Sequence, residues 1–197
     1  MGIVERTRAR WGCYIGLMRF VLPLLLLGSS LSVNGWTQGK GTSKRASTAV
    51  SMRSDTEGSI SVSFVSAPDG VALAGGSSGQ RGMNLGTVSQ AAGAQTSNVR
   101  VQKFSGRFVV STKFGLSIQD GSQHATTATV LAALAAPDSA YTFRLDGITM
   151  ETLPQMVQSQ VRIGPTFIHR LEIEVPTSLT EKNSQLNNAI IFQVIPN

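Results

Sequence analysis

Cysteine, aromatic residues and charge are all scarce in this sequence. It has one cysteine, Cys13, while charged residues make up 14% of the chain and aromatic residues 6%. One thiol cannot form an intrachain disulfide, and a zinc site would need more His or Cys than the chain offers. Even the apolar run near the N-terminus, Phe20–Leu27, is far shorter than the roughly 18 residues of a membrane-spanning helix. The fold must therefore be held by its hydrophobic core.

The residues that are abundant suit an extracellular all-β protein. Hydrophobic residues make up 41% of the 197 residues, enough for one folded domain with an extension or a leader. The chain also has 20 glycines and many serines and threonines. The formal charge of +6 would fit nucleic acid, but the basic residues are scattered and lack interleaved aromatics. We therefore expect no nucleic-acid partner.

The first 35 residues have the three parts of a secretory signal. The apolar run is broken only by Pro23, and Val33 and Gly35 stand at the −3 and −1 positions of a cleavage site before Trp36. The flank before the run is basic, with Arg6, Arg8, Arg10 and Arg19. We expect residues 1–35 to be a signal peptide and the mature protein to be secreted, either extracellular, periplasmic or at the cell surface.

Two alternatives for this segment stay open. It could remain as an uncleaved signal anchor, or translation could begin at Met18, because MRFVLPLLLLGSSLSVNG is by itself a complete short signal. Cleavage after Gly35 would remove four of the 17 basic residues and one of the 11 acidic residues, which leaves a charge of +3. It would also remove Cys13, so the mature chain would have no thiol and no membrane span.

Residues 36–58 are predicted to form a flexible tether. Glycine, serine and threonine are frequent there, and the basic cluster at 40–45 has no apolar period. The predicted folded domain is therefore residues 59–197.

Alternating apolar residues predict strands in the first half of this domain. Ile60–Phe64 alternates with serines, and the turn residues 68–70 (Pro-Asp-Gly) follow, before a glycine-rich loop at 74–82. The longest alternation is Phe108–Ile118. Gly115 inside it predicts a bulge or a bend.

The second half of the domain continues the pattern. Residues 125–136 fit a helix or a strand, and we favour a strand because the neighbouring segments are strands. Ala189–Ile195 is apolar on both parities apart from Gln193. That pattern predicts a strand covered on both sides, or covered on one side and at a subunit contact on the other. Further strands are predicted at Tyr141–Leu145, Val157–Ile163 and Phe167–Val175, with a turn at Asp146-Gly147.

Eight or so short strands separated by turn signals predict an all-β sandwich or barrel. The segments NLGTVS, FSGRFVVSTKFGLSI, YTFRLDGI, HRLEIEVPTSL and IIFQVIP, within roughly residues 84–195, resemble secreted bacterial β-sandwich proteins of the spore coat U-like and chaperone–usher pilin-like families. The resemblance implies an immunoglobulin-like antiparallel β-sandwich used as a surface or fibre subunit. Those families commonly carry a disulfide, and pilin subunits have a penultimate tyrosine, whereas this chain ends Ile195-Pro196-Asn197.

Few side chains are placed for catalysis. His169 shares the parity of the apolar strand residues, which predicts a hydrogen-bonded histidine at the core's edge, and His124 lies in a predicted solvated loop. Glu172 and Glu174 share the outer face of one strand, which favours surface charge pairing over calcium or ligand contact. The glycine-rich loop matches no phosphate-binding motif. We expect no enzymatic activity, cofactor or metal, although a triad depends on geometry that sequence order does not reveal.

The predicted function is structural. Ile60, Val62 and Phe64 form a strand between the tether and the glycine-rich loop, and such a strand either pairs within its own sandwich or adds to a neighbour's edge. We expect a non-enzymatic structural or adhesive cell-envelope protein, a fibre or surface-layer subunit, with this strand as the candidate for homo-oligomer formation. The alternative is an extracellular module that binds carbohydrate or another ligand, with a surface glycan or an envelope protein as partner. Against it, the mature chain has only Trp36 and Tyr141 beyond its phenylalanines.

Overall fold

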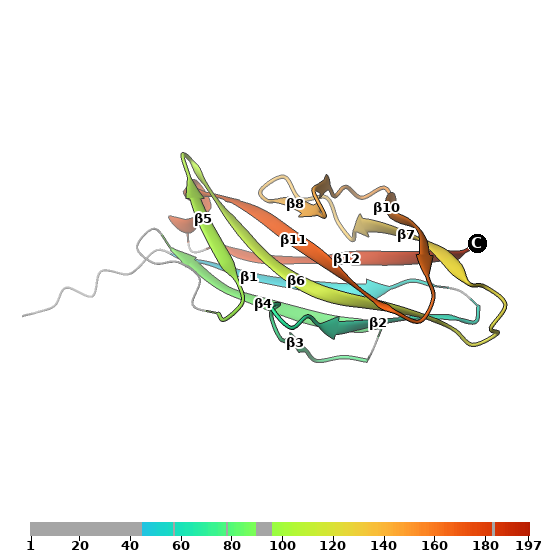
Figure 1. Cartoon of the computed structure of the whole chain (residues 1–197). Helices are drawn as coiled ribbons and strands as arrows, with labels where there is room; N and C mark the ends of the chain where they lie inside the picture. The colour runs from blue at the N-terminus through green and yellow to red at the C-terminus, as the bar shows by residue number, and fades with distance from the viewer. Residues whose placement is uncertain (1–44, 57, 78, 90–95, 183) are drawn as a thin grey trace, which may run out of the picture. The chain divides into compact units, whose positions relative to one another are not determined.

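The chain folds into two β-sheets packed into a sandwich (Figure 1). The computed structural model describes residues 45–56, 58–77, 79–89, 96–182 and 184–197. The strands are β1 (Arg45–Ser54), β2 (Ile60–Ser66), β3 (Leu73–Ala74), β4 (Gln80–Ser89), β5 (Arg100–Phe104), β6 (Arg107–Asp120), β7 (Thr127–Leu134), β8 (Thr142–Leu145), β9 (Ile148–Thr149), β10 (Gln155–Arg162), β11 (Thr166–Pro176) and β12 (Gln185–Pro196), and the described residues contain one short helix, α1 (Thr177–Thr180). The predicted all-β sandwich is confirmed. The predicted signal, residues 1–35, and residues 36–44 of the predicted tether lie outside the described residues.

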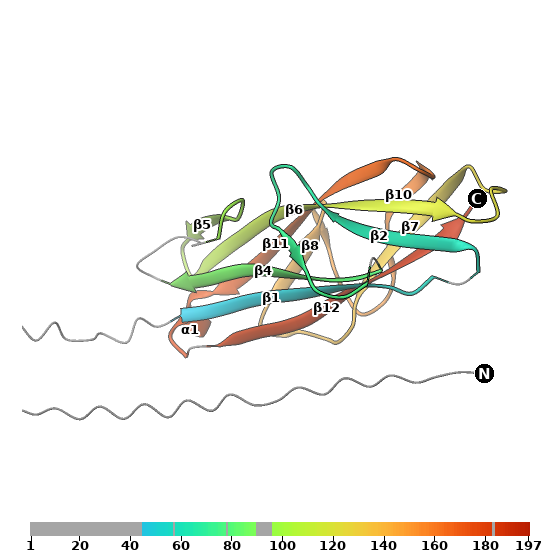
Figure 2. The ribbon, with the colours of Figure 1, turned by 90° about the horizontal axis from the view of Figure 1, so that it is seen from below.

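Sheet A has the strand order β10-β7-β12-β1-β4-β3, and β1 lies near its middle. β1 pairs in parallel with β12 on one edge and antiparallel with β4 on the other, as Figure 2 shows. The prediction of a tether that extends to residue 58 is therefore wrong for Arg45–Ser54. Two of the four buried inward positions of β1 are Ala46 and Thr48. A small residue and a hydroxyl weaken the apolar period, although Thr48 Oγ1 is satisfied because it donates to Gly86 O at 3.1 Å.

Sheet B has the order β2-β6-β11-β8-β9, with β5 also paired to β6. The long strands β6 and β11 pair over residues 107–117 and 166–176 without a shift in register. Because β11 occupies one edge of β6, β5 and β2 share the other edge. β5 lies opposite residues 107–111 and β2 opposite residues 114–120. Between β5 and β2, the described parts of the loops after β2 and before β5 contact β6 through Thr112.

The sequence predicts a bulge or a bend at Gly115, which lies in the middle of β6. The bulge is wrong, since the pairing of β6 with both β11 and β2 continues through Gly115 unshifted. A Cβ at this position would lie 2.5 Å from Val65 Cγ2 and 2.8 Å from Thr166 Cγ2. The glycine therefore makes room for two neighbouring side chains on the outer face of sheet B.

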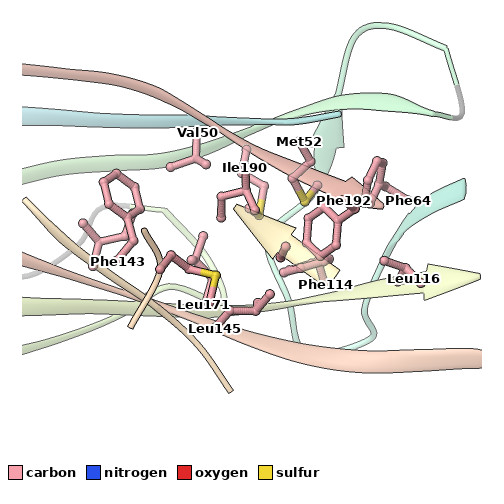
Figure 3. Close-up of a cluster of buried hydrophobic side chains, with 14 of the residues drawn as sticks. Val50, Met52, Phe64, Phe114, Leu116, Phe143, Leu145, Leu171, Ile190 and Phe192 are labelled. Atoms are coloured by element: carbon pink, nitrogen blue, oxygen red, sulfur yellow. The ribbon is translucent and has the colours of Figure 1, made fainter. Parts of the chain in front are cut away.

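The core lies between the inward faces of the two sheets (Figure 3). Phe64 and Phe114 come from sheet B and Phe192 from sheet A, and their ring centroids are 5.3, 6.0 and 6.5 Å apart. All three are buried. Burial of one such side chain contributes about 2–3 kcal/mol, and tilted aromatic pairs add to it. This aromatic cluster packs β12 of sheet A against β2 and β6 of sheet B.

Three local sequence predictions are confirmed. Residues 125–136 contain β7, a strand. Asp146 and Gly147 form a two-residue hairpin turn with φ of 51° and 86°, the positive values that a type I′ turn needs. The turn after β2 closes where Gly70 N donates to Ala67 O at 3.0 Å.

Candidate functional site

A hydrogen bond between a buried histidine and an aspartate joins β11 to the β8–β9 turn. His169 is 2% exposed, and its Nδ1 lies 2.6 Å from Asp146 Oδ2. Asp146 Oδ1 accepts a hydrogen bond from the Arg170 backbone N at 2.7 Å, and Asp146 N donates to Arg170 O at 2.9 Å. The predicted hydrogen-bonded histidine is confirmed. Its partner was not predicted, because the turn signal at Asp146 says nothing about which strand lies beside it.

The charge state of Asp146 shows which of the two groups, Asp146 or His169, carries the proton of their hydrogen bond. Burial raises the pKa of the Asp146 carboxyl, but the hydrogen bonds from the His169 ring and the Arg170 amide outweigh burial and hold that pKa below its usual value. An ionised carboxylate only accepts hydrogen bonds, so the proton between the two groups belongs to His169 Nδ1. Nε2 is buried without a hydrogen-bond partner among the described residues. The hydrogen bonds of Asp146 to His169 and to the Arg170 backbone hold the β8–β9 turn against β11.

His124 lies in the loop after β6, which is organised by Asp120. The Asp120 carboxylate accepts hydrogen bonds from the Ser59 and Ser122 hydroxyls and from the backbone N of Ser122, His124 and Ala125. These bonds, the one from Ser122 first, lower the pKa of Asp120 far below its usual value. His124 itself is exposed, as the sequence predicted for a solvated loop residue. The loop is therefore a structural cap on the β2–β6 end of sheet B.

We predict that Asp120→Asn destabilises the protein in a pH-dependent way. The lowered pKa of Asp120 means that its ionised form stabilises the fold fully above the unfolded carboxyl pKa, about 4, and that this contribution is lost as pH falls below it. The variant should therefore be less stable than the wild type at pH 6, with a smaller difference at pH 2. Thermal unfolding at both pH values measures this. An equal difference at both would contradict it.

Glu172 and Glu174 lie on the outer face of sheet B and are ion-paired. Glu174 contacts Arg107 at 3.2 Å and Arg144 at 2.8 Å, and Glu172 contacts Arg170 at 2.7 Å. The contacts agree with the predicted surface charge pairing. Pairs this exposed contribute at most about 1 kcal/mol each.

The candidate self-association residues Ile60, Val62 and Phe64 all point into the core, where each is buried. β2 pairs with β6 of its own sandwich. Gly121 N donates to Ser59 O, so by the alternation of an antiparallel ladder the backbone groups of Ile60, Val62 and Phe64 point to the other, outward edge. In the described part of the chain no strand pairs with that edge. Whether β2 exchanges between subunits stays a prediction.

A hollow of about 370 Å³ lies beside this outward edge. Its walls come from the end of β1, the start of β2 and the glycine-rich loop before β4; the residues are Arg53, Ser54, Thr56, Ile60, Ser61, Val62, Ser77, Gly79 and Gln80. Positive φ values at Gly75 and Gly76 bend this loop, and Arg81 Nη1 donates to Gly75 O at 3.1 Å. The loop lies close to β2, since a Cβ at Gly79 would be 3.5 Å from Val62 O, but none of its described residues has a backbone hydrogen bond to the β2 edge.

The outer face of sheet A is apolar around β12. Ile191 lines a hollow of about 220 Å³ with Leu131 and Pro154, and Met156 and Ile195 are 59% and 51% exposed nearby on β10 and β12. For Ala189–Ile195 the core covers one side of the strand, that of Ile190, Phe192 and Val194. The predicted cover on both sides is therefore wrong, and the alternative of a subunit contact on the other side stays a prediction.

Neither histidine lines the hollows described above. Within the described ranges, no three His, Cys, Asp or Glu side chains gather where a metal ion could bind. The same ranges contain no helix long and apolar enough to cross a membrane. No protein-family model matches the chain, and no curated protein matches it.

Proposed function

We propose that this protein is a non-enzymatic structural subunit, secreted to the cell envelope, whose copies associate through the free edge of β2. The observation that carries the proposal is the contrast between β2 and the other sheet edges. Natural sheets shield their edges with short strands, bulges, charges or covering loops, because an exposed regular edge pairs with other chains.

The other outermost strands in the described residues are shielded in these ways. β3 and β9 have two residues each, β10 has two irregularities in register with Gln160 at φ 52°, and β5 carries Arg100 and Lys103. β2 has seven residues in unbroken register. Its outward-facing side chains are Ser61, Ser63 and Val65, none of them charged. This edge is the one suited to accept a strand.

Addition to β2 is favoured over release of β2. Removal of Ile60, Val62 and Phe64 from the core would expose three buried side chains, at roughly 2 kcal/mol or more for each. β1, which precedes β2, is fixed between β12 and β4, so β2 is not a free end of the domain. A neighbouring copy that adds a strand to the edge keeps both cores intact. The resemblance to spore coat U-like and pilin-like proteins supports the same structural role.

The test is a charge placed on the proposed edge. Ser61→Lys adds a lysine beside the hollow, and Ser159→Lys adds the same charge to an exposed position of β10. Sedimentation velocity on the full chain over a range of concentrations should show that Ser61→Lys weakens self-association at least about tenfold, or 1.4 kcal/mol, while Ser159→Lys leaves it unchanged. A wild type that stays monomeric at high concentration, or equal behaviour of the two variants, would refute the proposal.

A further inference from the structure

A polar groove of about 470 Å³ lies on the outer face of sheet B. It occupies the place where the free edge of β6 passes from β5 to β2, since the β5 pairing ends at Ser111 and the β2 pairing at Phe114. The loops after β2 and before β5 form its walls. The lining residues are Asp69, Asn98, Val99, Arg100, Ser111, Thr112, Lys113 and Arg170.

The walls of the groove are tied together by hydrogen bonds, so the site is formed before any ligand arrives. Thr112 Oγ1 accepts from Val71 N at 3.1 Å and donates to Asn98 O at 3.0 Å. Asn98 Nδ2 donates to Gly70 O at 3.1 Å. Asn98 has a φ of 62°, a value that asparagine tolerates better than most residues. Both loops are thereby held against β6 through one threonine hydroxyl.

The charges in the groove are unbalanced. Lys113 and Arg170 are directly opposite each other on β6 and β11, an arrangement of like charges that is destabilising. Each turns to a carboxylate: Lys113 to Asp69 and Arg170 to Glu172. Arg100 adds a third cation, so these residues together have three positive and two negative charges, and only Arg100 has no carboxylate partner among the described residues. An anion in the groove would balance this charge.

Two groups in the groove are left for a ligand. Arg100 is exposed and has no ion-pair or hydrogen-bond partner among the described residues. Ser111, directly opposite Arg100 in the β5–β6 pairing, is 7% exposed and likewise has no side-chain partner there. A free guanidinium offers the two parallel donors that a carboxylate accepts. A free hydroxyl beside it both donates and accepts, as a sugar hydroxyl does.

We infer that this groove binds an acidic saccharide, with the carboxylate of the sugar on Arg100 and one of its hydroxyl groups on Ser111. The volume is in the lower part of the range for small-ligand sites, about 300–1,000 Å³. Among the described residues no aromatic side chain lines the groove, so an acidic saccharide would be held through its carboxylate and hydroxyl groups without ring stacking. The same lack of aromatics disfavours single-stranded nucleic acid, whose bases stack on them. The site does not overlap the free edge of β2, so it stands independently of the proposed self-association.

The test is calorimetric titration of the full chain with an oligogalacturonide, a neutral galactose oligomer of equal length, and inorganic sulfate. Arg100→Gln should weaken oligogalacturonide binding at least about tenfold, the size expected for loss of a charge-assisted contact. Arg162→Gln is the matched control, because Arg162 is an exposed arginine of β10 outside the groove. Ser111→Ala should weaken binding several-fold and leave sulfate unaffected.

Each other outcome overturns the inference. Equal effects of Arg100→Gln and Arg162→Gln would show binding to net charge alone. Equal affinity for the neutral oligomer would remove the role of the carboxylate, and equal affinity for sulfate would show a site for small anions without a saccharide. Absence of binding to the oligogalacturonide would refute it directly. Ser61→Lys, which tests self-association, should bind the oligogalacturonide as the wild type does, so failure of one proposal is distinguishable from failure of the other.

Discussion

Replacement of Asp146 by alanine should lower the free energy of unfolding by about 3 kcal/mol. Two effects combine. Asp146 has a φ of 51°, and the left-handed conformation costs a residue such as alanine about 1–2 kcal/mol. The change also removes the acceptor of His169 Nδ1, and a buried donor left unsatisfied costs about 1–3 kcal/mol.

Two further variants separate these effects. Asp146→Gly keeps the turn, because glycine adopts a positive φ freely, so its loss of about 2 kcal/mol reports the unsatisfied histidine. Asp146→Asn keeps the turn and one oxygen acceptor but removes the charge. Because the pKa of Asp146 is held below its usual value, the ionised carboxylate stabilises the fold above about pH 4 and this contribution is lost as pH falls. Asp146→Asn should therefore approach the wild type at low pH.

Urea unfolding followed by far-ultraviolet circular dichroism at pH 7 and pH 3 measures all three variants. A loss below about 0.5 kcal/mol for both Asp146→Ala and Asp146→Gly, the range of ordinary surface substitutions, would contradict the structural role of the pair. Equal destabilisation by alanine and glycine would show that the turn contributes nothing.

The sequence predicts the strands of sheet B well because their large apolar residues share one parity. Along β6, Phe108, Val110, Phe114, Leu116 and Ile118 are buried in the core, and the residues of the other parity are small or polar apart from Val109. A period of two is then visible without any knowledge of partners. The same reasoning fails for β1, because its inward positions begin with Ala46 and Thr48. These are buried by packing between β12 and β4, which local composition does not reveal.

The groove on sheet B could not be predicted from the sequence, for a different reason. Arg100, Ser111, Lys113 and Arg170 belong to three strands, and they meet because of the register of β5 and β11 on β6. Taken one at a time, the sequence indicates an ordinary polar strand residue at each of these positions. The histidine–aspartate pair is similar: the parity of His169 predicts its burial, but only the pairing of β11 with β8 brings Asp146 beside it. Sequence periodicity predicts which side a residue faces, whereas a site depends on which strands are neighbours.

Replacement of Gly70 by alanine should destabilise the protein by about 3 kcal/mol and close or distort the groove. A Cβ at residue 70 would lie 2.0 Å from Lys113 O and 2.8 Å from Lys113 C. Both are backbone atoms of β6, at the stretch where neither β5 nor β2 pairs with it. Neither the added methyl group nor the backbone of Lys113 can relieve this contact by rotating a side chain, so the loop itself must move. Overpacking of this kind costs about 1–3 kcal/mol.

Movement of the loop adds further losses. Gly70 N donates to Ala67 O, Gly70 O accepts from Asn98 Nδ2, and Val71 N donates to Thr112 Oγ1. Each of these bonds contributes roughly 1 kcal/mol.

Gly82→Ala is the matched control, because the nearest atom to its added Cβ is Ala74 O at 3.5 Å, an ordinary contact. Denaturant unfolding should show the full loss for Gly70→Ala and almost none for Gly82→Ala. Because Asp69 moves with the loop and Asn98 loses its hydrogen bond to Gly70 O, Gly70→Ala should also weaken oligogalacturonide binding under conditions where the variant is still folded. A stable Gly70→Ala protein that binds as the wild type does would show that the loop after β2 neither seals the β6 edge nor shapes the groove.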